Sequence, residues 1–322
     1  MKQNYDKNII EWLFHQFFPE KEIFTYEVCD GGVENSNFLL ITSDGKYVLK
    51  VFESSRHDEK IIRSEVEIMV EVRNMGSCVP EIFLTQEGQS IIIWPEWKLV
   101  ILMEFIQGEK YHDILPDSEL YCLLGKRVAE FQNNLADISE KYFAPERHIF
   151  DIAYLFTHSE LHMCVPEYSK ASFLHSVWAD LNEIKDTFLK LPHQIIHNDI
   201  NSANVIFRDH EPYFIDFSDM VRGTCIQDIA IALTQKCFHH KWNPEWTSHF
   251  LAWFQTIRQL TDEEKICLFW CIEARMLNIL MIPYLDIGVG DYGEIQDYIR
   301  AYHDSLNKFH EFWKENFMKL IF

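Results

Sequence analysis

The feature that most constrains the fold is a change in hydrophobic periodicity close to residue 107. Before it, residues 8–18 are amphipathic, a helix is expected at about 58–74, and short apolar runs predict an antiparallel sheet. Its strands are expected at 23–29, 37–42, 46–52, 81–85, 90–94 and 99–105. After it, apolar residues recur at helical spacing almost to the end of the chain. The sequence therefore predicts an α+β chain of two lobes: a sheet lobe with one inserted helix at 1–106, and a larger, mostly helical lobe at 107–322.

The charge balance and the apolar segments exclude several classes of partner. The 322 residues include 50 acidic and 29 basic side chains, which argues against binding to a nucleic acid. The eight cysteines show no paired spacing typical of a zinc site or a disulfide framework. The most apolar long segment, 268–285, is interrupted by Glu273, Arg275 and Asn278, so no membrane span is expected. Because no apolar signal segment follows Met1, we expect a cytoplasmic protein, and the sequence indicates nothing about oligomeric state.

A short strand-like island at 194–217 interrupts the helical half and carries a distinctive set of polar residues. Asp199 and Asn204 lie five residues apart in a polar loop, and Asp216 follows an apolar run twelve residues later. Phosphoryl transfer needs an acceptor for the proton of the substrate hydroxyl, oxygen ligands for Mg²⁺ and positive charge near the phosphates. These three side chains could supply the first two. Either acid alone would fit a polar turn that caps backbone groups, but their joint spacing favours the chemical interpretation.

The pattern HxDxxxxN at 197–204 is followed by Ile215, Asp216 and Phe217. Together they resemble the catalytic and metal-binding loops of the aminoglycoside phosphotransferase and choline kinase family, relatives of the protein kinases. The resemblance implies a bilobal protein-kinase-like fold, ATP and Mg²⁺ as cofactors, and a small hydroxylated molecule as substrate. It also implies roles for the matching residues: Asp199 as catalytic base, Asn204 and Asp216 as metal ligands, and His197, Asp219 and Asp228 as loop support. The chain departs from the family at Asn198, where glycine is usual.

A kinase-like helical lobe requires a sheet lobe that supplies a lysine for the phosphates of ATP. Lys50 fits, because it lies in a strand between apolar neighbours. Glu65 is the one charged residue on an otherwise apolar face of the helix at 58–74. An acid on a buried face needs a cation, so we expect Glu65 to hold Lys50. Lys50 could instead be an ordinary charge on an edge strand.

Two further backbone segments are expected to contact the nucleotide. A polar turn at 30–37 precedes the Lys50 strand and should cover the phosphates, unless it is only a hairpin loop. Its candidate residues are Gly31, Gly32, Asn35, Ser36 and Asn37. By the resemblance, the hinge between the lobes follows Met103, so the backbone of Glu104 and Ile106 should meet the adenine. The GxGxxG sequence at 288–293 follows a helix and carries an acid, so we do not interpret it as a nucleotide site.

The first loop, at 32–38, is most similar to that of the bacterial homoserine kinases of this family. A homoserine-like amino-acid alcohol is therefore the favoured substrate. Such kinases commonly lack a lysine at the Lys50 position, whereas hydroxylysine, choline and aminoglycoside kinases have one, so those acceptors, and ethanolamine, stay open. A catalytically silent nucleotide-binding protein of the same fold is the alternative from another class.

Two residues of the last third of the chain are candidates for contact with the substrate. Arg275 could clamp a carboxylate with two hydrogen bonds, or it could pair internally with Glu273 or another acid. Tyr284 could join Trp270 and Tyr292 in a cage for an amine, although core packing is the more common role of such rings.

Overall fold

The computed structural model describes residues 5–29, 35–53, 59–94, 98–111, 113–114, 117–145, 151–157, 171–237, 243–286, 303–311 and 316–322. Within helices and strands, the side chains of residues 171–175, 235–237, 281–286 and 320 lie outside this description. The predicted phosphate residues Gly31 and Gly32, the sequence at 288–293, Tyr292 and the side chain of Tyr284 therefore lie outside the described part of the molecule.

The N-terminal lobe is built on a five-stranded antiparallel sheet with the order β1-β2-β3-β5-β4. Its strands are β1 (Ile23–Val28), β2 (Ser36–Thr42), β3 (Lys46–Val51), β4 (Ile92–Trp94) and β5 (Lys98–Glu104). The strand predicted at 81–85 is wrong, because this segment makes only an isolated bridge from Ile82 to Met103. A tight turn at 43–45 joins β2 to β3, as the sequence predicted.

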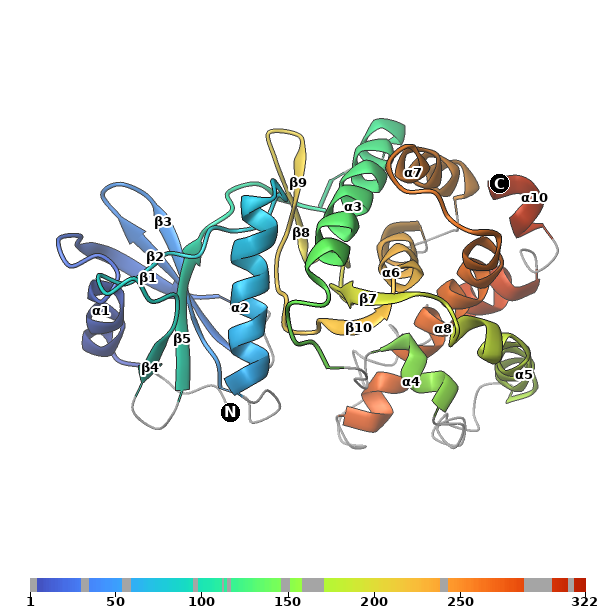
Figure 1. Cartoon of the computed structure of the whole chain (residues 1–322), viewed down its shortest axis with the longest axis horizontal. Helices are drawn as coiled ribbons and strands as arrows, with labels where there is room; N and C mark the ends of the chain where they lie inside the picture. The colour runs from blue at the N-terminus through green and yellow to red at the C-terminus, as the bar shows by residue number, and fades with distance from the viewer. Residues whose placement is uncertain are drawn as a thin grey trace.

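Two helices cover opposite faces of this sheet. Helix α1 (Lys7–His15) packs Leu13 and Phe14 in one cluster with Leu49 of β3. Helix α2 (Glu59–Asn74) lies between the sheet and the helical lobe, as Figure 1 shows, and its Val66 belongs to the other core cluster. Since successive side chains of a strand point to opposite faces, Lys50 lies on the face that is turned toward α2.

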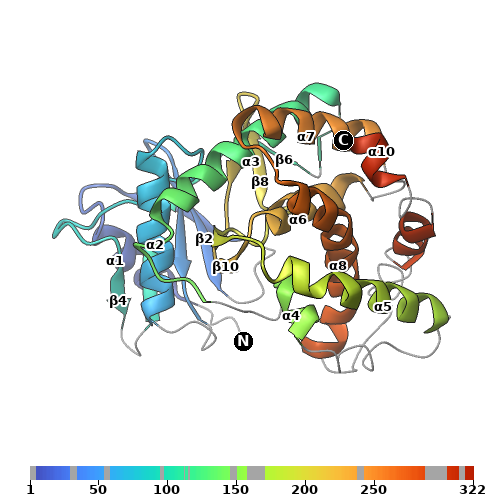
Figure 2. The same cartoon turned by 45° about the vertical axis from the view of Figure 1, so that its right-hand side comes forward.

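The C-terminal lobe is mostly helical (Figure 2). Its helices are α3 (Ser118–Ile138), α4 (Ile152–Thr157), α5 (Ala171–Phe188), α6 (Ile226–Cys237), α7 (Pro244–Ile257), α8 (Asp262–Asp286) and α10 (Phe317–Ile321), and residues 303–311 are also helical. Helices α3 and α7 lie side by side and cross closely at Gly125, where an added Cβ would lie 2.1 Å from the carbonyl oxygen of Phe250. Only glycine allows that approach.

Two small sheets hold the polar loops of this lobe. One pairs β7 (His193–Ile196) with β10 (Val221–Thr224). The other has the order β6-β8-β9, with β6 (Glu109–Lys110), β8 (Val205–Arg208) and β9 (Glu211–Phe214). The strand-like island in the sequence is therefore split between two sheets, and the loop with Asp199 connects them.

The fold matches the predicted arrangement of an N-terminal antiparallel sheet followed by a larger helical region. The predicted boundary at residue 106 follows directly after β5 and stays a prediction. Among the described residues, no helix is long and apolar enough to cross a membrane.

Candidate active site

The loop between β7 and β8 folds back on itself through an asparagine that sequence reasoning passed over. The side-chain oxygen of Asn201 accepts the backbone N–H groups of Ala203 (2.7 Å) and Asn204 (3.2 Å). This local turn is typical of asparagine. It brings the amide nitrogens of Asn201 (2.8 Å) and Asn204 (2.6 Å) onto Oδ2 of Asp199. The polar turn and the candidate chemical site are thus the same structure, rather than alternatives.

The other carboxylate oxygen of Asp199 contacts a residue from a distant helix. Nη2 of Arg275, on α8, donates to Oδ1 of Asp199 over 3.2 Å. Of the two sequence hypotheses for Arg275, internal pairing with an acid is therefore observed, and that acid is Asp199. Glu273 instead lies 2.9 Å from the imidazole of His310.

A buried aspartate fixes the start of this loop. Asp228, in the first turn of α6, accepts the backbone N–H groups of His197 (3.2 Å) and Asn198 (2.7 Å). Burial raises the pKa of Asp228 to about 7, and the two N–H bonds only partly offset that effect. Asn198 has a φ of 64°, in the left-handed region that favours glycine. The backbone geometry thus explains why glycine suits this position.

His197 connects the loop to the segment that follows β9. Its Nδ1 accepts the N–H of Asp199 at 3.3 Å, so the other nitrogen, Nε2, carries the proton and donates to the carbonyl of Ile215 at 3.2 Å. Burial lowers the pKa of His197 and keeps the ring neutral. The ring packs beside Phe131 and Phe217. His197 thereby links the Asp199 loop to the segment after β9, and its role as loop support stays a prediction.

Asp216 lies next to Asn204 because the N–H of Ile215 donates to the carbonyl of Asn204 at 3.0 Å. Its side chain is half-exposed, and its backbone φ is 62°. Partial burial raises the pKa of Asp216, but the nearby Lys50 ammonium and Ser218 outweigh that effect and hold the pKa below its usual range. Asp219 directly follows Ser218 in the same turn and is half-buried.

These two residues fit a magnesium ion by their chemistry. Asp216 offers carboxylate oxygens, and the amide nitrogen of Asn204 is used on Asp199, which leaves the amide oxygen for a cation. Magnesium is commonly held by one or two protein oxygens, with phosphates and water completing its shell. Across the described ranges, no group of three or more His, Cys, Asp or Glu could hold a metal ion by itself. The donor set thus suits a metal that arrives with a nucleotide.

Lys50 joins the two lobes, because it has one polar contact within the sheet lobe and two with the helical lobe. Its Nζ lies 3.2 Å from Glu65 of α2, and only 5% of the lysine and 2% of the glutamate side chains are exposed. The same atom lies 3.5 Å from Asp216 and 2.9 Å from the hydroxyl of Ser218. Burial lowers the pKa of Lys50, but the neighbouring carboxylates raise it by more. The net effect is a raised pKa, so the ammonium is charged. Ser218 had no sequence signal other than its position two residues after Asp216.

The predicted phosphate turn is shorter than the sequence indicated, because β2 already begins at Ser36. The hydroxyl of Ser36 donates to Glu53 at 2.7 Å, and its contact with the phosphates stays a prediction. Asn37 pairs with Lys50 in the β2–β3 register. Asn35 directly precedes β2, and its amide nitrogen is 3.5 Å from the Ser218 hydroxyl.

The segment predicted to meet adenine lies at the end of β5. The N–H of Glu104 donates to the carbonyl of Glu81 at 2.8 Å, so only its carbonyl could serve a base. The Glu104 carboxylate contacts Arg208 (2.5 Å) and Arg73 (3.2 Å). Ile106 follows two residues later and is buried.

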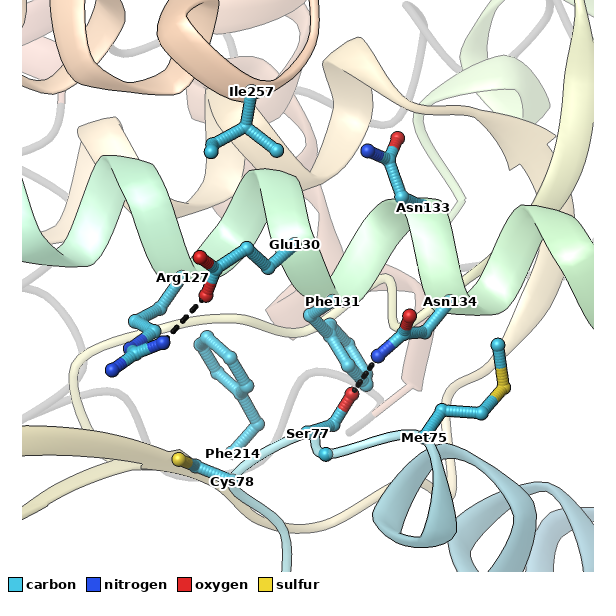
Figure 3. A pocket seen from close by; sticks show the side chains of 11 residues that line it. Met75, Ser77, Cys78, Arg127, Glu130, Phe131, Asn133, Asn134, Phe214 and Ile257 are labelled. Atoms are coloured by element: carbon cyan, nitrogen blue, oxygen red, sulfur yellow. Dashed lines mark hydrogen bonds and ion pairs between the residues drawn. The ribbon is translucent and has the colours of Figure 1, made fainter.

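A pocket of about 310 Å³ opens elsewhere, between the end of α2 and helix α3 (Figure 3). In it, the amide of Asn134 donates to Ser77 at 2.9 Å, and Arg127 pairs with Glu130 at 2.6 Å. None of the site residues predicted from the sequence lines this pocket, although its Phe131 ring also packs beside His197. The candidate active site is therefore the cluster of polar residues around Lys50, Asp199 and Asp216.

Comparison with known proteins identifies the family to which the chain belongs. Residues 25–268 match the phosphotransferase enzyme family. A homoserine kinase of Mesorhizobium japonicum is 25% identical over 297 residues, which cover 89% of this chain and 90% of that protein. A hydroxylysine kinase of Xenopus laevis is 24% identical over 266 residues, which cover 74% of this chain and 70% of that protein.

A solved structure has the same overall fold. An amicoumacin kinase, solved in complex with AMP-PNP, Ca²⁺ and Ami, superposes with a TM-score of 0.70 at 15% sequence identity. The superposition covers 95% of this chain and 97% of that one. The predicted bilobal protein-kinase-like fold is thereby confirmed.

Proposed function

The chain belongs to the phosphotransferase enzyme family and is a small-molecule kinase, and from this premise we propose that its substrate is a homoserine-like amino-acid alcohol. The two relatives described above support this choice, because both are named for amino acids that carry a hydroxyl group on the side chain. We propose ATP as the phosphoryl donor and Mg²⁺ as the metal ion.

One observation carries the proposal: residues from distant parts of the chain converge on one polar cluster. Lys50 of the sheet lobe reaches Glu65 and, 166 positions along the chain, Asp216. A positive charge for phosphates and an oxygen ligand for a metal therefore lie 3.5 Å apart. Phosphoryl transfer depends almost entirely on positioning and electrostatic stabilisation, which such a cluster can provide.

Each residue has a proposed task in the reaction. Asp199 accepts the proton of the substrate hydroxyl, and the amides of Asn201 and Asn204 hold its carboxylate in place. Lys50 binds the phosphates, with Glu65 holding the ammonium on the sheet. His197 and Asp228 keep the loop in the conformation that presents Asp199.

Magnesium and adenine would bind at the edges of this cluster. Asn204 and Asp216 would hold Mg²⁺, which supplies charge neutralisation on the phosphates when it is bound. The carbonyl of Glu104 and the N–H of Ile106 would contact the adenine. The turn with Gly31, Gly32, Asn35, Ser36 and Asn37 would cover the phosphates, and Asp219 would support the metal-binding turn.

The proposal is tested by an ADP-release screen of the purified protein with ATP and Mg²⁺. Homoserine is expected to give the highest kcat/KM, ahead of hydroxylysine, choline, ethanolamine and an aminoglycoside. The Asp199→Asn variant should lose about 10²–10⁴-fold in kcat, because a general base contributes that much, while nucleotide binding is retained. Asp209→Asn, at an exposed turn, is the matched control and should keep full activity. The rate of ADP release with each acceptor is compared with the rate in its absence. If no acceptor raises that rate, the proposal is contradicted.

A further inference from the structure

Arg275 holds the candidate base with only part of its hydrogen-bonding capacity. Its side chain is 7% exposed, and Nη2 donates to Oδ1 of Asp199 over 3.2 Å. Its Nε is buried, and within the described residues it has no hydrogen-bond partner. A buried N–H group left without a partner costs roughly 1–3 kcal/mol, so a site of this kind favours a ligand that would satisfy it.

Arg127 provides a comparison, because both nitrogens on one edge of its guanidinium group donate hydrogen bonds. Arg127 donates from Nε and from Nη2 to the two oxygens of Glu211, each over 2.7 Å. These two nitrogens form one edge of a guanidinium group, and that edge matches the two oxygens of a carboxylate. Arg275 therefore donates from one of the two nitrogens of this edge, whereas Arg127 donates from both. The bond from Arg275 to Asp199 is also longer than the bonds from Arg127 to Glu211, so Asp199 is the easier carboxylate to replace.

The Nε–Nη2 edge of Arg275 would be matched by an anion with two oxygens in one plane. A carboxylate and a phosphate both fit this description. The carboxylate of the acceptor is favoured by position, because Arg275 contacts Asp199, which handles the acceptor, whereas Lys50 is the cation beside Asp216. An amino-acid alcohol carries such a carboxylate, and an amino alcohol without it does not.

We infer that the Nε–Nη2 edge of Arg275 binds the carboxylate of the acceptor and, in doing so, releases Oδ1 of Asp199 for the hydroxyl proton. This inference rests on the proposed function. It makes Arg275 the residue that selects acceptors with a carboxylate. Such an acceptor binds to Arg275, and its binding also frees Asp199 to act as the base. An acceptor without a carboxylate leaves Arg275 on Asp199.

The test compares homoserine with 3-aminopropan-1-ol, which has the same hydroxyl and amine but no carboxylate. In the wild type, kcat/KM for homoserine should be higher by about tenfold to 150-fold, the range for hydrogen bonds to charged groups. Arg275→Gln and Arg275→Lys should lose most of that ratio, with a raised KM for homoserine. For 3-aminopropan-1-ol, kcat should rise, because the guanidinium no longer holds Asp199. Arg127→Lys, which breaks a comparable pair outside the site, should leave the ratio unchanged.

Several outcomes would overturn the inference. Equal losses of kcat/KM for both acceptors in the Arg275 variants would mean that the residue only supports the loop. A raised KM for ATP with unchanged selectivity would mean that the bound anion is a phosphate. If the wild type had the same kcat/KM for homoserine and for 3-aminopropan-1-ol, the inference would be refuted without any variant. The assignment as a kinase would still hold. Turnover of neither acceptor by the wild type would refute the proposed substrate class as well.

Discussion

Asn198 combines two unfavourable features at a single residue. Its φ of 64° is costly for a side chain with a Cβ. Both polar atoms of its buried amide are also without a hydrogen-bond partner in the part of the chain that the structure describes. The backbone explains the position, because the N–H of Asn198 must point at Asp228. Nothing in the described contacts requires the side chain itself.

We therefore expect Asn198→Gly to stabilise the protein. The substitution relieves the left-handed strain and removes two unpaired polar atoms, although it leaves a small cavity, so the net gain should be about 1 kcal/mol in the free energy of unfolding. Urea unfolding followed by circular dichroism measures this change.

Asn198→Ala is the matched control for that substitution. It also removes the polar atoms but keeps a Cβ at positive φ, so it should be less stable than the glycine variant. A glycine variant less stable than the wild type would show that the asparagine amide makes a favourable interaction.

At the scale of single elements, α2 matters because it carries the partner of Lys50 on its buried face. Replacing Glu65 with glutamine would leave a buried ammonium with weaker compensation. Removal of one partner of a buried pair costs roughly 3–5 kcal/mol, and the remaining contacts of Lys50 with Asp216 and Ser218 place the expected loss near the lower limit. We also expect the KM for ATP to rise about tenfold, the equivalent of one charge-assisted hydrogen bond.

The matched control is Glu67→Gln, on the exposed side of the same helix, which should change neither quantity. The double variant Lys50→Met, Glu65→Leu should recover most of the lost stability but not nucleotide binding, because an apolar pair can replace a buried ion pair. An unchanged KM for ATP in Glu65→Gln would contradict the role assigned to α2.

Helix α6 makes the stability of the protein depend on pH through Asp228. Burial raises the pKa of Asp228 to about 7 in the folded protein, whereas an unfolded Asp titrates near about 3.9. Between these values the folded state binds the extra proton. The contribution of Asp228 to the free energy of unfolding is therefore largest below about pH 4 and falls as the pH rises to about 7, by up to roughly 4 kcal/mol.

Urea unfolding of the wild type and of Asp228→Asn, from about pH 4.5 to pH 8, isolates this effect. The variant cannot ionise at this position, so the wild type should lose stability relative to it as the pH rises. A wild type that gains stability relative to the variant over this range would mean that the N–H bonds from His197 and Asn198 outweigh burial and lower the pKa.

At the scale of the whole molecule, the contact between Lys50 and Asp216 links the sheet lobe to the helical lobe over 3.5 Å. A nucleotide with its metal ion should occupy the same region and bind only the folded chain. Ligand at 100 times its Kd then adds about 2.7 kcal/mol to the free energy of unfolding. We expect ATP with Mg²⁺ to raise Tm more than ATP with EDTA, and removal of the metal to abolish turnover.

Asp216→Asn should remove the extra rise in Tm that Mg²⁺ produces. Comparing each variant with and without the metal cancels the change in its own stability, including the loss of the Lys50 contact. Asp209→Asn serves again as the control and should keep the full metal effect. An equal rise with Mg²⁺ in Asp216→Asn would exclude Asp216 as a ligand.

The sequence by itself determined the order of the lobes and the main polar residues. The spacing of apolar residues changes from that of strands to that of helices near residue 107. Asp199 and Asn204 come together because they lie five residues apart in one turn. Glu65 was identified by its place on an apolar helix face, which helical geometry fixes locally. Features that depend on spacing within one element are readable from sequence.

The tertiary structure alone decided which distant side chains meet. Arg275 lies 76 positions from Asp199, and Ser218 lies 168 positions from Lys50, so no period along the chain connects them. The hydroxyl of Ser36 donates to Glu53 because β2 and β3 pair as a hairpin. Such contacts depend on how α8, the sheet and the loops cross in space, and the crossing is set by packing of the whole core, which the local pattern does not specify.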